Sequence, residues 1–212
     1  NGGIYDSFTE ITCYGDSITE GVGASSYETC YVSRFAAMTG AICRNYGISG
    51  TRIAKRRVPY DIPEFDRYYA SRVPEMDPDA DIVVVFGGTN DYGHGDAPLG
   101  EMNDRTIWTY YGALHVLFTS LLEKYPAAQI VVLTPLHRDD EEKYTPTLKP
   151  FVDATRQVAE FYSLPVLDLW ANYGIQPRIP VMKNMYVPDG LHPNDAGHGI
   201  LANKLRAFLE QL

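Results

Sequence analysis

Hydrophobic residues in this chain fall into short continuous runs, separated by longer amphipathic stretches. Residues 82–86 have the sequence IVVVF, which is apolar throughout instead of alternating. That pattern is typical of a strand covered on both faces. Runs of similar length predict four further strands, at residues 11–14, 41–46, 130–134 and 166–169.

The stretches between these runs have the spacing of amphipathic helices. The clearest is residues 106–125, where apolar residues recur every three or four positions and Pro126 follows at the expected end. Three more helices are predicted at residues 27–38, 150–162 and 195–212, the first of them ended by Gly40. Residues 59–72 are ambiguous and are interpreted as a short helix between loops.

Strands and helices that alternate along a chain predict a parallel sheet between two helix layers, because parallel strands need crossover connections. We therefore expect an α/β fold, a three-layer α/β/α sandwich with a five-stranded, flavodoxin-like sheet. The chain has 212 residues and no linker, repeat or low-complexity tract. This length predicts one domain over residues 1–212.

Charge and composition exclude several classes of partner. The net charge of −9 disfavours nucleic acid and anionic lipid as partners. No run of about 18 apolar residues is present, so no membrane span is expected. No signal peptide is recognisable, which favours the cytoplasm over secretion, although Asn1 in place of Met leaves room for a removed leader. The three cysteines are expected to be buried thiols without disulfides.

Small and polar residues follow the first three predicted strands and precede the last helix. Ligands of open α/β sheets bind beyond the carboxyl ends of the strands, so these loops are expected to meet at one site. Their sequences are GDSIT at 15–19, GISGT at 47–51, GGTND at 87–91 and DGLHP at 189–193.

Together these loops supply the groups that acyl transfer requires. Ser17 offers a hydroxyl, which is a weak nucleophile without a neighbouring base. His192 is the best base by residue type, and Asp189, three residues earlier, can fix its tautomer. The Ser17 N–H, the Gly50 N–H and the Asn90 side chain are candidate donors to an oxyanion. Each residue alone is more simply a turn or cap residue, so the prediction depends on their combination.

At these positions the chain resembles the SGNH/GDSL hydrolases. Residues 15–17, 45–50, 87–91 and 189–193 are similar to that family's conserved blocks, with Tyr14 and Ile18 as small departures. The resemblance implies catalysis by Ser17, His192 and Asp189, and an oxyanion hole built from Ser17, Gly50 and Asn90. It also implies attack of Ser17 on an ester, followed by hydrolysis of the acyl-enzyme. The family includes esterases, lipases, thioesterases, deacetylases and acyltransferases, so the resemblance leaves the substrate open.

Other motifs give little support to other chemistry. The GVG at residues 21–23 lacks the third glycine of a dinucleotide loop, because Ser26 stands there. Neither a GxSxG elbow nor an HExxH motif is present, and neither a cofactor nor a metal is expected. The basic run at residues 52–57 is interpreted as a solvated stretch, or else as a contact for an anionic substrate group.

The leading hypothesis is a cofactor-independent serine esterase acting on a small-molecule or glycan ester. Tyr92, His137 and Arg138 are candidate substrate-binding residues, and the 16 tyrosines mildly favour a carbohydrate-linked or short-chain ester. An acyltransferase that uses the same site is the alternative, and a binding module without activity is a third reading. The oligomeric state stays open.

Overall fold

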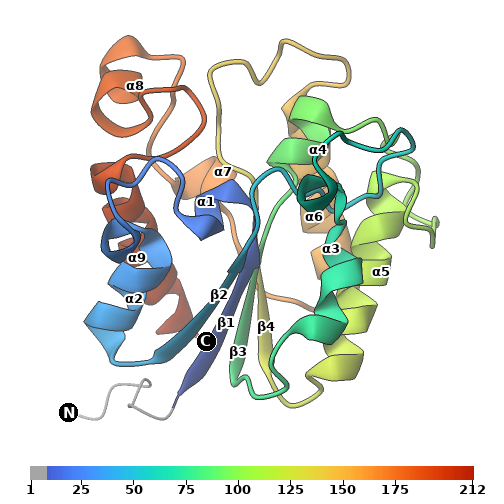
Figure 1. Ribbon diagram of the computed structural model, residues 1–212, viewed down its shortest axis with the longest axis horizontal. Helices are drawn as coiled ribbons and strands as arrows, with labels where there is room; N and C mark the ends of the chain where they lie inside the picture. Colours follow the sequence, from blue (N-terminus) through green and yellow to red (C-terminus); the bar gives the residue numbers. More distant parts are fainter. Residues whose placement is uncertain (1–8) are drawn as a thin grey trace.

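A computed structural model describes residues 9–212 of the protein. Its centre is a sheet of five parallel strands in the order β2-β1-β3-β4-β5 (Figure 1). The strands are β1 (Glu10–Gly15), β2 (Ile42–Gly47), β3 (Ile82–Phe86), β4 (Gln129–Leu133) and β5 (Val166–Leu167). This order is that of flavodoxin-like folds. The predicted α/β sandwich is therefore confirmed.

Helices cover both faces of the sheet. On one face α2 (Tyr31–Thr39) packs against α9 (Asp195–Leu209) (Figure 1). On the other face α5 (Tyr110–Lys124) packs against α3 (Tyr69–Arg72) and α6 (Leu148–Phe161). The remaining helices are α1 (Ser17–Glu20), α4 (Thr89–His94), α7 (Leu169–Asn172), α8 (Pro180–Tyr186) and the 3₁₀ helices η1 (Tyr27–Thr29), η2 (Pro63–Asp66) and η3 (Val73–Glu75).

The side chains of β3 explain why its sequence is apolar throughout. Val83 and Val85 belong to the hydrophobic core under α5 and α6, whereas Val84 and Phe86 belong to the core under α2 and α9. Alternate residues of a strand point to opposite faces, so a sheet covered on both sides needs an apolar residue at every position. Burial of both faces is the main source of the fold's stability.

Several boundaries differ from the sequence prediction for local reasons. The helix predicted from residue 106 begins at Tyr110, because the Thr109 side chain accepts a hydrogen bond from Gly112 N and caps it. The predicted helix at 27–38 is divided by Cys30, an extended residue between η1 and α2. The strand predicted at 166–169 is only two residues long, since Asp168 caps α7.

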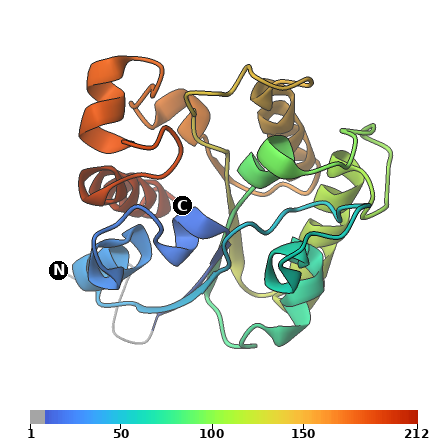
Figure 2. The same cartoon turned by 45° about the horizontal axis from the view of Figure 1, so that its top comes forward.

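The carboxyl ends of the strands carry α1, α4 and the segment before α9 (Figure 2). From β1 the chain moves to one edge of the sheet to form β2, and it then crosses to the other side of β1 to form β3. The switch point of the sheet therefore lies between β1 and β3, where ligands of this architecture bind. Ser17 follows β1, and α4 follows β3. The fold thus brings residues from distant parts of the sequence to one edge.

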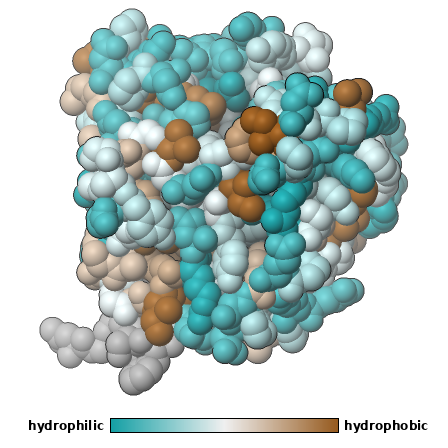
Figure 3. Space-filling view, viewed as in Figure 1, coloured by the Kyte–Doolittle hydropathy of each residue, from teal (hydrophilic) through white to brown (hydrophobic). Residues whose placement is uncertain are grey.

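The surface is mixed in polarity. On the face in Figure 3, hydrophobic residues form separate small patches in a mainly hydrophilic surface. Within residues 9–212, none of the helices has the length and hydrophobicity needed to cross a bilayer. Cys13 and Cys30 are buried free thiols, and Cys43 is a partly buried one.

Candidate active site

Ser17 lies at the first position of α1, directly beyond the end of β1. Asp16 is the N-cap of this helix, and its carboxylate accepts a hydrogen bond from Ile18 N at 3.0 Å. Burial raises the pKa of Asp16 to about 6, although the bond from Ile18 and the nearby His192 act in the opposite direction. Asp16 therefore fixes the turn that presents Ser17, as the N-cap of the helix.

The Ser17 hydroxyl contacts the predicted base. The distance from Ser17 Oγ to His192 Nε2 is 2.9 Å, and that from His192 Nδ1 to Asp189 Oδ2 is 2.6 Å. A carboxylate can only accept hydrogen bonds, so the ring carries its proton on Nδ1. Nε2 is then free to accept the proton of Ser17.

The loop that carries His192 is organised around the Asp189 carboxylate. Asp189 Oδ1 accepts hydrogen bonds from Leu191 N at 2.8 Å and from His192 N at 2.6 Å. Partial burial acts to raise the pKa of Asp189, but these bonds and the His192 ring outweigh it and lower the pKa. The carboxylate therefore stays charged and holds the imidazole in one tautomer.

Gly50 stands where no side chain would fit. Its φ is +74°, and a Cβ atom there would lie 2.8 Å from the ring of Phe65. Its carbonyl accepts a hydrogen bond from Arg52 Nη1 at 3.1 Å. Within residues 9–212, neither the Gly50 N–H nor the Ser17 N–H donates to a protein acceptor. Both are therefore available to a ligand.

Asn90 lies in the first turn of α4 and is 6% exposed. One N–H of its carboxamide donates to Thr51 O at 2.9 Å, which ties α4 to the loop that carries Gly50. The second N–H of Asn90 Nδ2 has no acceptor within the part of the chain that the structure describes. The bond to Thr51 fixes the orientation of this second donor.

Asp91 also connects α4 to the loop that carries Gly50. Its two carboxylate oxygens accept hydrogen bonds from Ile53 N and Ala54 N, both at 2.9 Å. Burial raises the pKa of Asp91 to about 7, against the effect of these two bonds and of Arg52. Asp91 is thus a buried link between α4 and the Gly50 loop, as expected of a structural residue.

Two buried arginines in this region were not recognised from the sequence. Arg52 is 2% exposed and bonds Asp66 at 2.9 Å and His94 at 3.2 Å, so a solvated basic run is wrong for this residue. The Arg72 guanidinium contacts the rings of both Tyr14 and Tyr69, with Cζ 4.6 Å and 5.0 Å from their centroids. Its guanidinium also donates to backbone carbonyls at the ends of β1 and β2. For Arg72, the sequence signal for burial is an arginine that lies close to aromatic residues along the chain.

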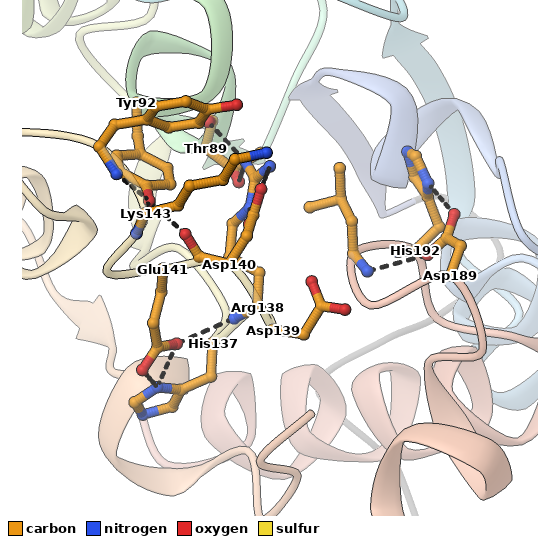
Figure 4. Close-up of polar contacts among 12 residues, drawn as sticks. Thr89, Tyr92, His137, Arg138, Asp139, Asp140, Glu141, Lys143, Asp189 and His192 are labelled. Carbon is orange, nitrogen blue, oxygen red and sulfur yellow. Dashed lines mark hydrogen bonds and ion pairs between the residues drawn. The ribbon is translucent and has the colours of Figure 1, made fainter. Parts of the chain in front are cut away.

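The three candidate substrate-binding residues are engaged within the protein. Tyr92 is buried, and its hydroxyl accepts a hydrogen bond from Lys143 N at 3.1 Å. Arg138 is 8% exposed and bonds Thr89 and Asp140 (Figure 4). His137 bonds Glu141 at 2.8 Å and stacks on Trp170. A role of these residues in substrate binding stays a prediction.

The described residues contain no prearranged metal site. Within residues 9–212, no group of three or more His, Cys, Asp or Glu side chains is placed to hold a metal ion. The groups at this edge are a hydroxyl, an imidazole, a carboxylate and three N–H donors that have no acceptor among residues 9–212. They are suited to nucleophilic attack on a carbonyl.

A parallel α/β fold with these groups at one edge of its sheet is typical of hydrolases that act on acyl groups. The sequence matches the GDSL-like Lipase/Acylhydrolase family over residues 13–200. The chain therefore belongs to that family, and the resemblance found in the sequence is confirmed. No match was found among curated proteins.

Solved structures with the same fold include a Lactobacillus plantarum protein with 33% identity and a TM-score of 0.84, over 98% of this chain and 99% of that chain. A member of the lipolytic G-D-S-L family from Veillonella parvula has 17% identity and a TM-score of 0.68, over 96% and 100%. The salicylyl-acyltransferase SsfX3 has 20% identity and a TM-score of 0.68, over 97% of this chain and 55% of that one.

Proposed function

We propose that this protein is a serine ester hydrolase with Ser17 as nucleophile, His192 as general base and Asp189 as the residue that orients His192. The observation that carries the proposal is the continuous contact from Ser17 Oγ through the His192 ring to Asp189, at 2.9 Å and 2.6 Å. Hydrogen-bond reach between nucleophile, base and orienting group is the signature of an activated serine.

The reaction follows from these contacts. Ser17 Oγ attacks the ester carbonyl carbon while its proton passes to His192 Nε2. His192 then donates that proton to the leaving alcohol as the C–O bond breaks. In the second half, His192 accepts a proton from the water that attacks the acyl carbon. It returns this proton to Ser17 Oγ as the acyl C–O bond breaks, which releases the acid and restores Ser17. Asp189 stabilises the imidazolium in both halves without taking up the proton.

The oxyanion hole is assigned to the Ser17 N–H, the Gly50 N–H and the second N–H of Asn90. All three lack a protein acceptor within residues 9–212. Donors that are already fixed need no reorganisation when charge develops on the carbonyl oxygen. The site needs no cofactor for this chemistry.

The substrate is proposed to be a short-chain or carbohydrate-linked ester. The face in Figure 3 has no broad apolar area of the kind that would bind a lipid surface. An alcohol could replace water in the second half-reaction, which gives an acyltransferase, and a protein named a salicylyl-acyltransferase has this fold. Product analysis with and without a sugar acceptor distinguishes hydrolysis from transfer.

The test is turnover of p-nitrophenyl acetate by Ser17→Ala. We expect a loss of roughly 10⁴–10⁶ in kcat, because the nucleophile is removed while the donors stay. Ser120→Ala is the matched control, since the Ser120 hydroxyl donates to Val116 O within α5, the same helix. Thermal unfolding should show a folded protein in both variants. Turnover by Ser17→Ala equal to that of the wild type would falsify the proposal.

A further inference from the structure

Three consecutive residues after β4 connect the two halves of the candidate site. Arg138 and Asp140 contact α4, which carries Asn90, and Asp139 contacts the loop that carries Asp189 and His192. Figure 4 shows Asp139 between the Arg138 cluster and the His192–Asp189 pair. We call residues 138–140 the bridge.

The α4 end of the bridge is firmly held. Arg138 Nη1 donates to both Thr89 O and Thr89 Oγ1 at 3.1 Å, and Arg138 Nε donates to Asp140 Oδ1 at 2.5 Å. The guanidinium lies over the ring of Tyr92, 5.1 Å from its centroid. The Tyr92 hydroxyl donates in turn to Asp140 O. Every contact is buried or half-buried, so this end is a rigid support.

The other end of the bridge meets Gly190, the residue after Asp189. Asp139 N donates to Gly190 O at 3.0 Å. Gly190 has φ +83° and is buried, and a Cβ atom there would collide with the Asp139 carboxylate. Asp139 thus holds Gly190 by a backbone bond and covers its Cα with its side chain.

The Asp139 carboxylate is oriented by an ion pair with Lys183 of α8 at 2.8 Å. Both side chains are about one-third exposed, at 35% for Lys183 and 33% for Asp139. Solvent screens such a pair, and exposed pairs are typically worth only about 0–1 kcal/mol. The packing on Gly190 should therefore matter more than the charge.

We propose that Asp139 is a positioning residue for the acid–base loop. By packing its carboxylate against Gly190, it keeps Asp189 and His192 at the distance from Ser17 that proton transfer requires. The loop's other described backbone bonds are local: Gly190 N donates to Val187 O and Asn194 N donates to Tyr186 O, both at 2.8 Å. Within residues 9–212, the bond from Asp139 N is the backbone bond that ties this loop to a distant part of the chain. The inference rests on the proposed function, because its effect is exerted through His192.

The test compares Asp139→Ala with Asp139→Asn in p-nitrophenyl acetate hydrolysis. Asp139→Ala removes the group that covers Gly190, and we expect kcat to fall about tenfold with KM little changed, since small displacements of catalytic groups are costly. Asp139→Asn keeps the shape and should retain most of kcat. Lys183→Ala should lose less than about threefold, because the pair is exposed. Lys149→Ala, which breaks the exposed Lys149–Asp153 pair on α6, is the matched control.

A double-mutant cycle with Gly190→Ala decides whether Asp139 acts through the loop. The added methyl group collides with the Asp139 carboxylate, so Asp139→Ala should cause little further loss in a Gly190→Ala background. Losses that multiply, or a wild-type kcat in Asp139→Ala, would overturn the inference. The inference would also be overturned if Asp139→Ala and Asp139→Asn lost kcat equally and both had a lower melting temperature than the wild type. An inactive wild-type protein would instead refute the proposed function.

Discussion

The two sides of the candidate site are built differently. The oxyanion side consists of α4 and the loop around Gly50, and it is buried and cross-linked by Asn90, Asp91 and Arg52. The acid–base side is a short loop whose Asp189 side chain is 56% exposed. Asn90, in contrast, is only 6% exposed.

This difference fits the tasks assigned to the two sides. Donors to an oxyanion act only if they are fixed before charge develops, which requires a rigid and buried frame. A base must exchange protons with alcohol and water, which requires access to solvent. The acid–base loop gains its order from Asp189, which binds two backbone N–H groups and the His192 ring.

The largest effect in this comparison is expected from Asp189→Asn. Its oxygen could still accept from the backbone, but its amide would donate to Nδ1. The Nε2 atom would then carry the proton and could no longer accept one from Ser17. We expect kcat to fall roughly 10²–10⁴-fold. Asp61→Asn, an exposed position, is the control. A kcat within twofold of wild type would remove Asp189 from the mechanism.

Asn90→Ala should have the next largest effect. It removes one oxyanion donor and the bond to Thr51 O, and we expect kcat to fall about 10²–10³-fold. KM should change little, because the donor acts mainly on the transition state. Asn103→Ala, at an exposed position, is the matched control. Equal losses in kcat and in substrate affinity would argue for a ground-state contact instead.

The buried Asp91 gives the oxyanion side a pH-dependent stability. Its folded-state pKa of about 7 is higher than the ordinary aspartate value of 3.8, so the folded protein binds this proton more tightly than the unfolded chain. The wild type should therefore gain stability relative to Asp91→Asn as pH falls through 7, by about 1.4 kcal/mol per unit until the unfolded pKa is reached. Urea unfolding of both proteins at pH 4.5, 6 and 8 measures the difference. A constant difference would contradict the assignment.

Hydrogen exchange should detect the same contrast without mutation. The amides of Ile53 and Ala54 donate to the buried Asp91, whereas those of Leu191 and His192 donate to the exposed Asp189. We expect the first pair to exchange at least about tenfold more slowly, because solvent-exposed loops open at low free energy. Equal protection would show that the acid–base loop is as rigid as α4.

The sequence predicts the sheet well because buried strands carry a clear signal. The run at 82–86 coincides with β3, and Gly40 ends α2 as expected. Short helices such as α4 and α8 have too few residues for a periodic pattern, so the sequence predicts a loop where α4 lies. Ser17, Gly50 and Asn90 follow predicted strands, and His192 precedes the last helix. Because parallel strands share one carboxyl edge, these positions predict that the four residues lie together.

Contacts that depend on tertiary structure were not predictable in the same way. Arg52 lies in a basic run that suggests solvent, and only the positions of Asp66 and His94 explain its burial. Asp139 is one of four consecutive acidic residues, and nothing in that run distinguishes the one that meets Gly190. Such roles arise from packing between loops, which no local pattern records.

The most direct test of the central claim is the site of labelling by a fluorophosphonate probe, read by mass spectrometry of the digested protein. The account predicts one adduct, on the peptide that contains Ser17, and much slower labelling in His192→Ala. No adduct on that peptide, or an adduct on a different serine at the wild-type rate in Ser17→Ala, would contradict it.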